Sequence, residues 1–271
     1  MRLTLIPSPF ALDQFRQSMG RAPEALLAAG LVAALQSDGH AVSVAEHPLD
    51  LGSGSQMDRL GRNSARLAEA VAAARQAGTL PLILGGDCLV AIGVVAGLRR
   101  ALAGDLGIAW FDAHGDFNTP ATTLSGYLGG MPLACVCGRG LDELRAAAGL
   151  ARPVDEAQVA LLGVRDLDEP EAALLDTTPV RRFPPADLTR FTAEARPTYL
   201  HFDIDALDLA LAPGVNYPAP GGLSLSAALA AARQVRAHLA ALALTAVDPE
   251  KDEQGQTVQT ALALLRGLLS D

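Results

Sequence analysis

Short hydrophobic runs alternate with longer stretches rich in Ala and Leu along the whole chain. The runs predict buried strands, at residues 3–6, 41–45, 80–84, 107–111, 159–164, 198–204 and 241–247. The stretches between them predict helices, at residues 23–36, 62–77, 89–102, 169–175, 224–239 and 256–269. This alternation indicates right-handed βαβ units, and strands that are nearly uniform in apolarity indicate helices on both faces of the sheet. We therefore expect one α/β domain over residues 1–271, with three layers (α/β/α) around a mostly parallel sheet.

Composition and charge narrow the class of partner. Hydrophobic residues make up 50% of the chain, but every apolar stretch is shorter than a membrane span. Residues 1–10 are typical of a short strand and not of a secretory signal. The formal net charge of -9 opposes a phosphate backbone, and no basic run interleaved with aromatic residues offsets it. We expect no membrane or nucleic-acid partner, which leaves small molecules and metal ions.

The three cysteines, Cys88, Cys135 and Cys137, cannot all pair. Cys135 and Cys137 are two positions apart on a predicted helix, where their side chains would point away from each other. Their apolar neighbours favour small core residues over redox groups. Unpaired cysteines are typical of a reducing compartment, so we expect a cytoplasmic protein.

Two long irregular segments follow predicted strands that end in acidic residues. They cover residues 115–130 and 206–223. Long loops in compact domains usually serve a function, and ligands of open α/β sheets bind beyond the carboxyl ends of the strands. We expect both segments to frame one site.

Acidic residues cluster at these two strand ends. Asp112, His114 and Asp116 occupy alternate positions, and an extended backbone would place all three side chains on one face. Asp203 and Asp205 repeat this pattern at the end of another strand. A single Asp-x-His-x-Asp triplet could merely cap a following helix, but two such clusters favour a metal site.

Four carboxylates and one imidazole cannot be desolvated together unless cations neutralise them. Oxygen-rich ligation with one imidazole favours Mn²⁺ or Mg²⁺ over structural zinc. Two ions about 3.5–4 Å apart can share a water, lower its pKa and present hydroxide to an electrophilic carbon. The pattern therefore predicts two divalent ions, with manganese preferred, and hydrolysis without a protein nucleophile. His201 lies deeper in its strand, and we interpret it as a hydrogen-bonded core histidine rather than a ligand.

Five segments of the chain resemble known sequence motifs. They are Gly85-Gly-Asp-Cys-Leu89, Asp112-Ala-His-Gly-Asp116, His201-Phe-Asp-Ile-Asp205, the loop Ala212-Pro-Gly-Val-Asn-Tyr-Pro-Ala-Pro-Gly-Gly222, and Val247-Asp-Pro-Glu-Lys-Asp252 with Thr260-Ala261. In these segments the chain resembles the ureohydrolase family of arginases, agmatinases and formimidoylglutamases, whose signatures include Gly-Gly-Asp-His-Ser, Asp-Ala-His-x-Asp and Ser-x-Asp-x-Asp. The resemblance runs from residue 80 onward. It implies an arginase-like fold and a hydrolase acting on C–N bonds of linear amidines.

The resemblance also implies roles for the clustered residues. Asp112 and Asp203 would bridge the two metals, and His114 and Asp205 would bind the second metal. Asp116 would bind the first metal and hydrogen-bond the bridging hydroxide. Catalytic roles thus fall on Asp116 and His114.

The remaining ligand position falls on Cys88, where the family usually has histidine. A thiolate can bind a divalent ion and would be deprotonated by it. It is also softer than imidazole and adds negative charge to the cluster. We take Cys88 as the sixth candidate ligand, and the alternative is a buried cysteine at a strand end.

The resemblance divides substrate recognition into two parts. The family counterparts of Asn118, Ser125 and Asp168 recognise α-carboxylate and α-amino groups, which favours an amino-acid substrate over agmatine. The histidine that arginases use for proton transfer falls on Gly129, and the glutamate that pairs with the guanidinium falls on Ala246. The chain therefore keeps the amino-acid end of the pattern and departs from it at the guanidinium end.

These departures argue against ordinary L-arginine, because burying its permanently charged guanidinium without a carboxylate would cost on the order of several kcal/mol. An N-hydroxyguanidine is less basic and could enter neutral. Cys88, Gly115-Asp-Phe-Asn-Thr-Pro120 and Gly126-Tyr-Leu-Gly-Gly-Met131 also resemble family members that act as Nω-hydroxy-L-arginine amidinohydrolases, although Ala246 departs even from these. Tyr217 replaces a small residue in a loop expected to line the pocket.

The leading hypothesis is an amidinohydrolase with two Mn²⁺ ions that converts an Nω-hydroxy-L-arginine-like substrate to ornithine and hydroxyurea. One rival is another C–N hydrolase of the family, acting on a formimidoyl compound, a guanidino acid, arginine or agmatine. A second rival is a catalytically silent member that binds metal. A monomer is favoured over a homo-oligomer.

Overall fold

The computed structural model describes residues 1–46 and 52–270. Within them, an eight-stranded sheet has the order β4-β1-β5-β10-β9-β6-β7-β8, and neighbouring strands are parallel throughout. Its strands are β1 (Arg2–Ser8), β4 (Ala41–Val44), β5 (Leu80–Gly85), β6 (Gly107–Phe111), β7 (Val159–Leu162), β8 (Arg181–Phe183), β9 (Thr198–Asp203) and β10 (Leu239–Thr245). A small antiparallel pair, β2 (Phe10–Ala11) and β3 (Gln14–Phe15), lies apart from this sheet.

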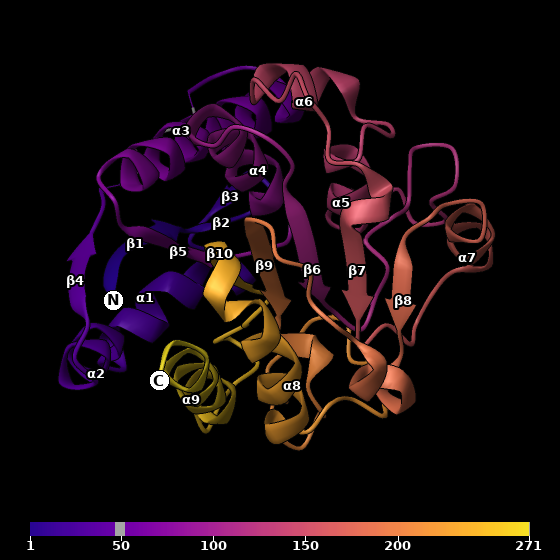
Figure 1. Cartoon of the computed structure of the whole chain (residues 1–271). Helices are drawn as coiled ribbons and strands as arrows, with labels where there is room; N and C mark the ends of the chain where they lie inside the picture. Colours follow the sequence, from indigo (N-terminus) through magenta and orange to yellow (C-terminus); the bar gives the residue numbers. More distant parts are fainter. Residues whose placement is uncertain (47–51, 271) are drawn as a thin grey trace.

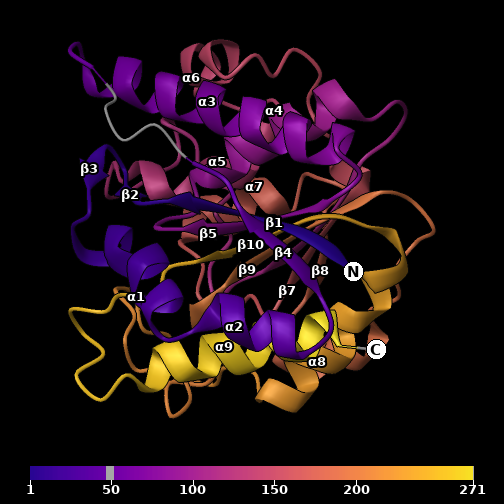
Figure 2. The ribbon, with the colours of Figure 1, turned by 90° about the vertical axis from the view of Figure 1, so that its left-hand side faces the viewer.

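Helices cover both faces of the sheet, as Figure 2 shows from the side. One face carries α3 (Gln56–Gln76), α4 (Val90–Ala101), α5 (Pro132–Val136) and α6 (Asp142–Ala147). The other carries α1 (Ala22–Ala28), α2 (Leu31–Ser37), α8 (Leu225–Ala232) and α9 (Gln256–Leu269), and α7 (Glu169–Leu175) lies beside β8 (Figure 1). Short 3-10 helices are η1 (Ser18–Arg21), η2 (Leu128–Gly130), η3 (Glu156–Gln158), η4 (Pro185–Arg190), η5 (Ile204–Ala206) and η6 (Arg233–His238). This arrangement confirms the predicted three-layer α/β/α fold.

The strands separate two hydrophobic cores. Every residue of β5, β6, β7 and β9 is buried. Alternate residues of β5 serve opposite cores, since Leu82 and Leu84 pack on one side and Ile83 on the other. Side chains of a strand alternate between the faces of a sheet, so a strand covered on both faces is apolar throughout.

The structure corrects several predicted elements. The helix predicted at residues 23–36 is two helices, because Gly30 takes a left-handed conformation (φ 88°) that interrupts the α-helical backbone. The helix predicted at residues 224–239 ends after α8 and continues as the 3-10 helix η6. Strand β8 was not predicted, because its three residues at the sheet edge, Arg-Arg-Phe, include one exposed residue and only one apolar residue.

The sheet order brings four strands of distant sequence together. Neighbours β5, β10, β9 and β6 end at the same edge of the sheet, and the predicted segments 115–130 and 206–223 follow two of them. Apart from η2, the first segment contains neither helix nor strand. Among the residues that the structure describes, none of the helices combines the length and the apolar character that crossing a membrane requires.

Candidate metal centre

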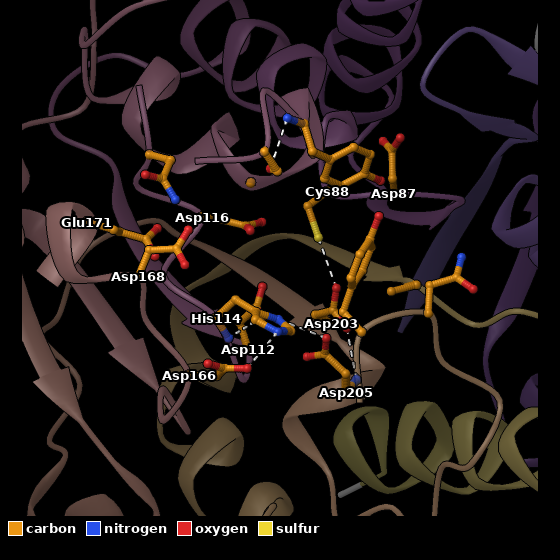
Figure 3. A pocket seen from close by; sticks show the side chains of 18 of the residues that line it. Asp87, Cys88, Asp112, His114, Asp116, Asp166, Asp168, Glu171, Asp203 and Asp205 are labelled. Atoms are coloured by element: carbon orange, nitrogen blue, oxygen red, sulfur yellow. Dashed lines mark hydrogen bonds and ion pairs between the residues drawn. The ribbon is translucent and has the colours of Figure 1, made fainter. Parts of the chain in front are cut away.

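A pocket of about 490 Å³ opens at the carboxyl ends of the four central strands. The six predicted metal ligands all line it. They are Cys88, Asp112, His114, Asp116, Asp203 and Asp205. Figure 3 shows Asp112, His114 and Asp205 close together, with Cys88 directed at Asp203. The sheet therefore brings together side chains from β5, β6 and β9.

Backbone and indole N–H groups fix the carboxylates at the strand ends. Asp112 Oδ1 accepts a hydrogen bond from the His114 N–H (2.8 Å), and its Oδ2 accepts one from Trp110 Nε1 (3.0 Å). Asp203 Oδ1 accepts from the Asp205 N–H (2.8 Å), and Asp205 Oδ1 accepts from the Ala113 N–H (3.1 Å). Each of these carboxylates keeps its place through the turn that directly follows a strand.

His114 lies between two of these carboxylates. Its Nδ1 is 3.3 Å from Asp112 Oδ1 and 3.1 Å from Asp205 Oδ2. Burial lowers the pKa of His114, but the hydrogen bonds and charges of Asp112 and Asp205 outweigh burial and raise it to about 12. The imidazolium thus supplies a cation between two carboxylates. Ligand atoms of Asp112, His114 and Asp205 lie within 4.8 Å of one another, as a shared metal ion would require.

Asp116 reaches the pocket by a route that the sequence did not predict. Strand β6 ends at Phe111, and Asp116 adopts a left-handed backbone (φ 48°) instead of the extended one. Its carbonyl oxygen accepts hydrogen bonds from Leu133 (3.0 Å) and Ala134 (3.2 Å) at the start of α5. Its carboxylate Oδ2 is buried and has no hydrogen-bond partner among the described residues. Burial and the Asp112 charge raise the pKa of Asp116 well above its usual range.

The charges of this cluster fit a divalent cation. Burial raises the pKa of Asp112 to about 6, and burial with the charges of Asp205 and Asp112 raises that of Asp203 well above its usual range. A buried carboxylate with no counter-ion destabilises the fold unless it binds a proton or a metal ion. Together with the unpartnered Asp116 Oδ2, these carboxylates are the oxygen-rich donor set that manganese and magnesium prefer.

Cys88 follows β5 and is buried within the cluster. Its Sγ donates to Asp203 Oδ2 (3.0 Å) and lies 3.4 Å from Thr245 Oγ1. Burial and the negative charge of Asp203 raise the pKa of Cys88 well above its usual range, so without a cation the group is a thiol. The side chain lies within reach of the same carboxylates that would hold a metal.

His201 lies beneath the cluster, as predicted for a core histidine. It is fully buried, its Nδ1 is 2.7 Å from the Tyr199 hydroxyl and its Nε2 is 3.3 Å from Thr245 Oγ1. Its ring stacks on Trp110 with centroids 3.6 Å apart. Burial lowers the pKa of His201 to about 3, so the ring is neutral. A ring nitrogen also lies within 4.8 Å of ligand atoms of Cys88 and Asp112, although its hydrogen bonds occupy both nitrogens.

The three predicted substrate-binding residues line the outer part of the same pocket. Asn118 is buried, and its Oδ1 accepts a hydrogen bond from Thr122 Oγ1 (2.9 Å), which leaves its amide N–H groups for a ligand. Ser125 and Asp168 are exposed at the rim, and Asp168 precedes the first turn of α7. The structure thus brings all nine predicted site residues to one cavity.

Glu171 is a pocket residue that the sequence analysis did not single out. It is buried, and its Oε1 accepts a hydrogen bond from the Phe117 N–H (2.8 Å). A Cβ atom at Gly115 would lie 2.6 Å from that oxygen, so the carboxylate requires glycine there. Burial raises the pKa of Glu171 to about 7. The spacing Asp168-x-x-Glu171 at the start of a predicted helix was the available signal.

Two tyrosines form a wall on the substrate side of the pocket. Tyr127 and Tyr217 both line it, and their ring centroids are 5.4 Å apart. Gly129 and Ala246, the positions that the resemblance assigns to histidine and glutamate, also line the pocket and bring no polar side chain to it. Ala246 adopts a left-handed backbone (φ 64°), and its N–H donates to the Gly86 carbonyl (2.7 Å).

Arg165, also missed by the sequence analysis, holds the loop between η5 and α8 against the cluster. Its guanidinium donates to the carbonyl oxygens of Asp205 (2.8 Å), Ala219 (2.9 Å) and Pro220 (3.0 Å). A planar group with five N–H donors can join several carbonyls at once. The loop that carries Tyr217 is therefore anchored to the turn that carries Asp205.

Solved structures of known proteins have the same fold. An arginase from Bacillus cereus superposes with a TM-score of 0.90 at 28% identity, covering 100% of this chain and 99% of that one. A formimidoylglutamase from Bacillus subtilis superposes with a TM-score of 0.74 at 19% identity, which shows the fold alone. The parallel sheet and the acidic cluster at its carboxyl edge define a protein of the ureohydrolase class.

Sequence comparison is more specific. Residues 1–270 match the arginase family model. The arginase of Bacillus caldovelox is 30% identical over 299 residues, which cover 99% of this chain and 98% of that protein. The chain belongs to the arginase family and is a hydrolase that acts on C–N bonds of linear amidines. Members of this family use a binuclear metal centre, typically of manganese, which agrees with the donor set found here.

Proposed function

We propose that this protein hydrolyses Nω-hydroxy-L-arginine to ornithine and hydroxyurea with two manganese ions. The observation that carries the proposal is the contrast within one pocket. The acidic cluster and the groups for an amino acid are present, whereas the position for a guanidinium partner holds Ala246. The substrate would therefore be an amino acid with a less basic amidine end.

The amino-acid end of such a substrate meets suitable groups at the rim. The Asn118 amide and the Ser125 hydroxyl can donate to an α-carboxylate. Asp168 can accept from an α-ammonium, and the buried Glu171 beside it adds negative charge on that side. Agmatine has no carboxylate, so it would leave the donors at Asn118 and Ser125 without their partner.

The reacting end meets a different environment. Ala246 contributes a methyl group where a carboxylate would pair with a guanidinium. Asp87 also lines the pocket, but its two oxygens accept hydrogen bonds from the Leu12 and Leu89 N–H groups and hold the loop after β5. A permanently charged guanidinium would therefore be desolvated without a partner, at a cost of about several kcal/mol, which a neutral hydroxyguanidine avoids.

Metal ions would be held by Asp112, His114, Asp116, Asp203, Asp205 and Cys88. When bound, they would lower the pKa of a water so that hydroxide is available near neutral pH. The Asp116 Oδ2 atom has no other hydrogen-bond partner among the described residues, so it is free to accept a hydrogen bond from that water and orient it toward the amidine carbon.

L-arginine is the second candidate substrate. The relatives named above are arginases, and the acidic cluster follows the family pattern except at Cys88. Turnover of L-arginine would require that the two tyrosines, or the acidic residues Asp168 and Glu171 near the rim, bind the guanidinium in place of a carboxylate at position 246.

Assays of the manganese-loaded protein separate these candidates. We expect kcat/KM for Nω-hydroxy-L-arginine to exceed that for L-arginine by about a hundredfold, the difference expected when a buried charge lacks its partner. We expect no turnover of agmatine. Equal or faster turnover of L-arginine would overturn the substrate proposal. Less than one manganese per chain by elemental analysis, with no turnover of any guanidine, would favour a catalytically silent member.

A further inference from the structure

The side chain of Tyr127 occupies the space beside Gly129. An ideal Cβ atom at Gly129 would lie 2.3 Å from Cε1, 2.5 Å from Cζ and 2.7 Å from the hydroxyl oxygen of Tyr127. Such distances are far below van der Waals contact, so any side chain at position 129 would displace the ring. Gly129 is itself buried and has an ordinary negative φ. Glycine is therefore required there by the neighbouring ring and not by the backbone.

Tyr127 lines the same pocket as the acidic cluster, and its hydroxyl oxygen lies beside Gly129. Asp87, Cys88 and Asp116 line that pocket too, and burial raises the pKa of the Tyr127 phenol, which therefore stays protonated. The ring itself is half-buried and contacts Tyr217 nearer the mouth. A protonated phenol can donate one hydrogen bond and accept another.

We propose that Tyr127 is a specificity-determining residue, whose ring replaces a side chain at position 129 and whose hydroxyl hydrogen-bonds the hydroxyguanidine end of the substrate. This inference rests on the function proposed above and names the group that meets the reacting end. A phenol hydroxyl is neutral, so it satisfies a neutral N–OH group but cannot neutralise a guanidinium. Tyr127 thereby adds selection for an uncharged amidine to that produced by Ala246.

The decisive variant is Tyr127→Phe, which keeps the ring and removes the hydroxyl. We expect kcat/KM for Nω-hydroxy-L-arginine to fall about fivefold to tenfold, the range for one hydrogen bond to a neutral group. Inhibition by ornithine should change less than about twofold, because ornithine binds at the rim and lacks the reacting end. Ser226→Ala is the control, since it removes an exposed hydroxyl on α8 outside the pocket, and we expect it to change neither value.

The outcomes of this experiment separate the inference from the proposed function. Unchanged kinetics in Tyr127→Phe, or equal weakening of substrate and ornithine, would overturn the role of the hydroxyl while leaving hydroxyarginine hydrolysis intact. If the wild-type protein prefers L-arginine, the proposed function fails. In that case, loss of L-arginine turnover in Tyr127→Phe without loss of ornithine binding would still support a contact between the Tyr127 hydroxyl and the reacting end of the substrate. If no substrate is turned over, calorimetry on the manganese-loaded protein measures the dissociation constants of Nω-hydroxy-L-arginine and ornithine directly. A protein that binds neither compound would overturn both the proposed function and the role of Tyr127.

A double-mutant cycle tests the steric part without any assay of activity. Gly129→Ala should lower the melting temperature of the wild-type protein, because its methyl group collides with the Tyr127 ring. In a Tyr127→Ala background the space is open, so the same change should have little effect. Equal effects of Gly129→Ala in both backgrounds would show that the ring does not fill this space.

Discussion

The strand-end cluster and the substrate-facing wall differ in how their side chains are held. Asp112 and Asp203 are buried at strand ends, and hydrogen bonds from the adjoining turn fix each carboxylate. Tyr127 and Tyr217 lie on loops, and Tyr217 is 51% exposed. The sheet thus determines where charge collects, whereas loop side chains determine what reaches it. A scaffold of this kind can change its substrate without rebuilding its metal centre.

The largest expected effect comes from removing a charge from the strand-end cluster. Asp203→Asn should lower kcat by about a thousandfold, or about 4 kcal/mol of transition-state stabilisation, because the proposed metal site would lose one of its carboxylates. In metal-free protein the same change should raise the melting temperature at pH 8 by about 2–4 °C, since one buried charge is removed. Differential scanning calorimetry with and without manganese measures both states.

Asp105→Asn, at an exposed surface residue, is the control for that variant. It should change neither kcat nor the stabilisation that manganese provides. A cluster variant that keeps full manganese-dependent stabilisation would show that Asp203 is not a ligand.

On the substrate side of the pocket, Ala246→Glu should move specificity toward L-arginine. A carboxylate at this position can pair with a guanidinium, so we expect kcat/KM for L-arginine to rise about tenfold or more. Ala246→Gln has the same shape without the charge and should give no such rise. Steady-state kinetics on both substrates check this, and an equal gain for Gln would assign the effect to shape.

Cys88→His connects the two regions, because Cys88 is the one predicted cluster position that departs from the family pattern. Imidazole suits manganese better than a thiolate does, so we expect about tenfold tighter manganese binding. Titration calorimetry with manganese measures the affinity, and Cys88→Ser is a control of similar size. If affinity and activity are unchanged in both variants, residue 88 does not coordinate metal.

The last expected effect concerns stability alone and is a pH dependence at the rim. Burial raises the pKa of Glu171 to about 7 from an ordinary value of 4.5. The protonated carboxyl group of Glu171 therefore contributes fully to the free energy of unfolding below pH 4.5. About 1–3 kcal/mol of this contribution is lost as the pH rises through 7. Metal-free Glu171→Gln should lose less stability between pH 5 and pH 8 than the wild type does. Glu169→Gln, an exposed neighbour on α7, should behave like the wild type.

The sequence predicted the fold and the cluster because both follow from local patterns. Strand β9 is mostly apolar before it ends in Asp203, so its burial and the position of its carboxylate could be predicted together. Helix α9 has the bounds predicted for it, since its apolar positions recur with helical spacing. The break at Gly30 was missed because helix periodicity continues on both sides of it.

Tertiary contacts account for the rest. The sequence indicates a lost side chain at Gly129, but the ring that fills the space belongs to Tyr127, two positions earlier. Asp116 joins the cluster through a left-handed turn anchored on α5, and not through the extended geometry that its spacing suggested. Arg165 acts through carbonyl groups of a distant loop, which no spacing along the chain reveals, and Glu171 acts through the N–H group of Phe117.

The crowding at Gly129 has a consequence for the order in which this protein could change. Ala246 already occupies a left-handed conformation that strains any L-residue, so a longer side chain there adds little backbone strain and is one substitution away. Histidine at position 129 is blocked until Tyr127 has been replaced by a smaller residue. A change of specificity to arginine could thus begin with a substitution at position 246. It could not introduce histidine at position 129 without an earlier mutation that opens the space. Laboratory selection for growth on arginine should find its first substitutions at 246 or 127.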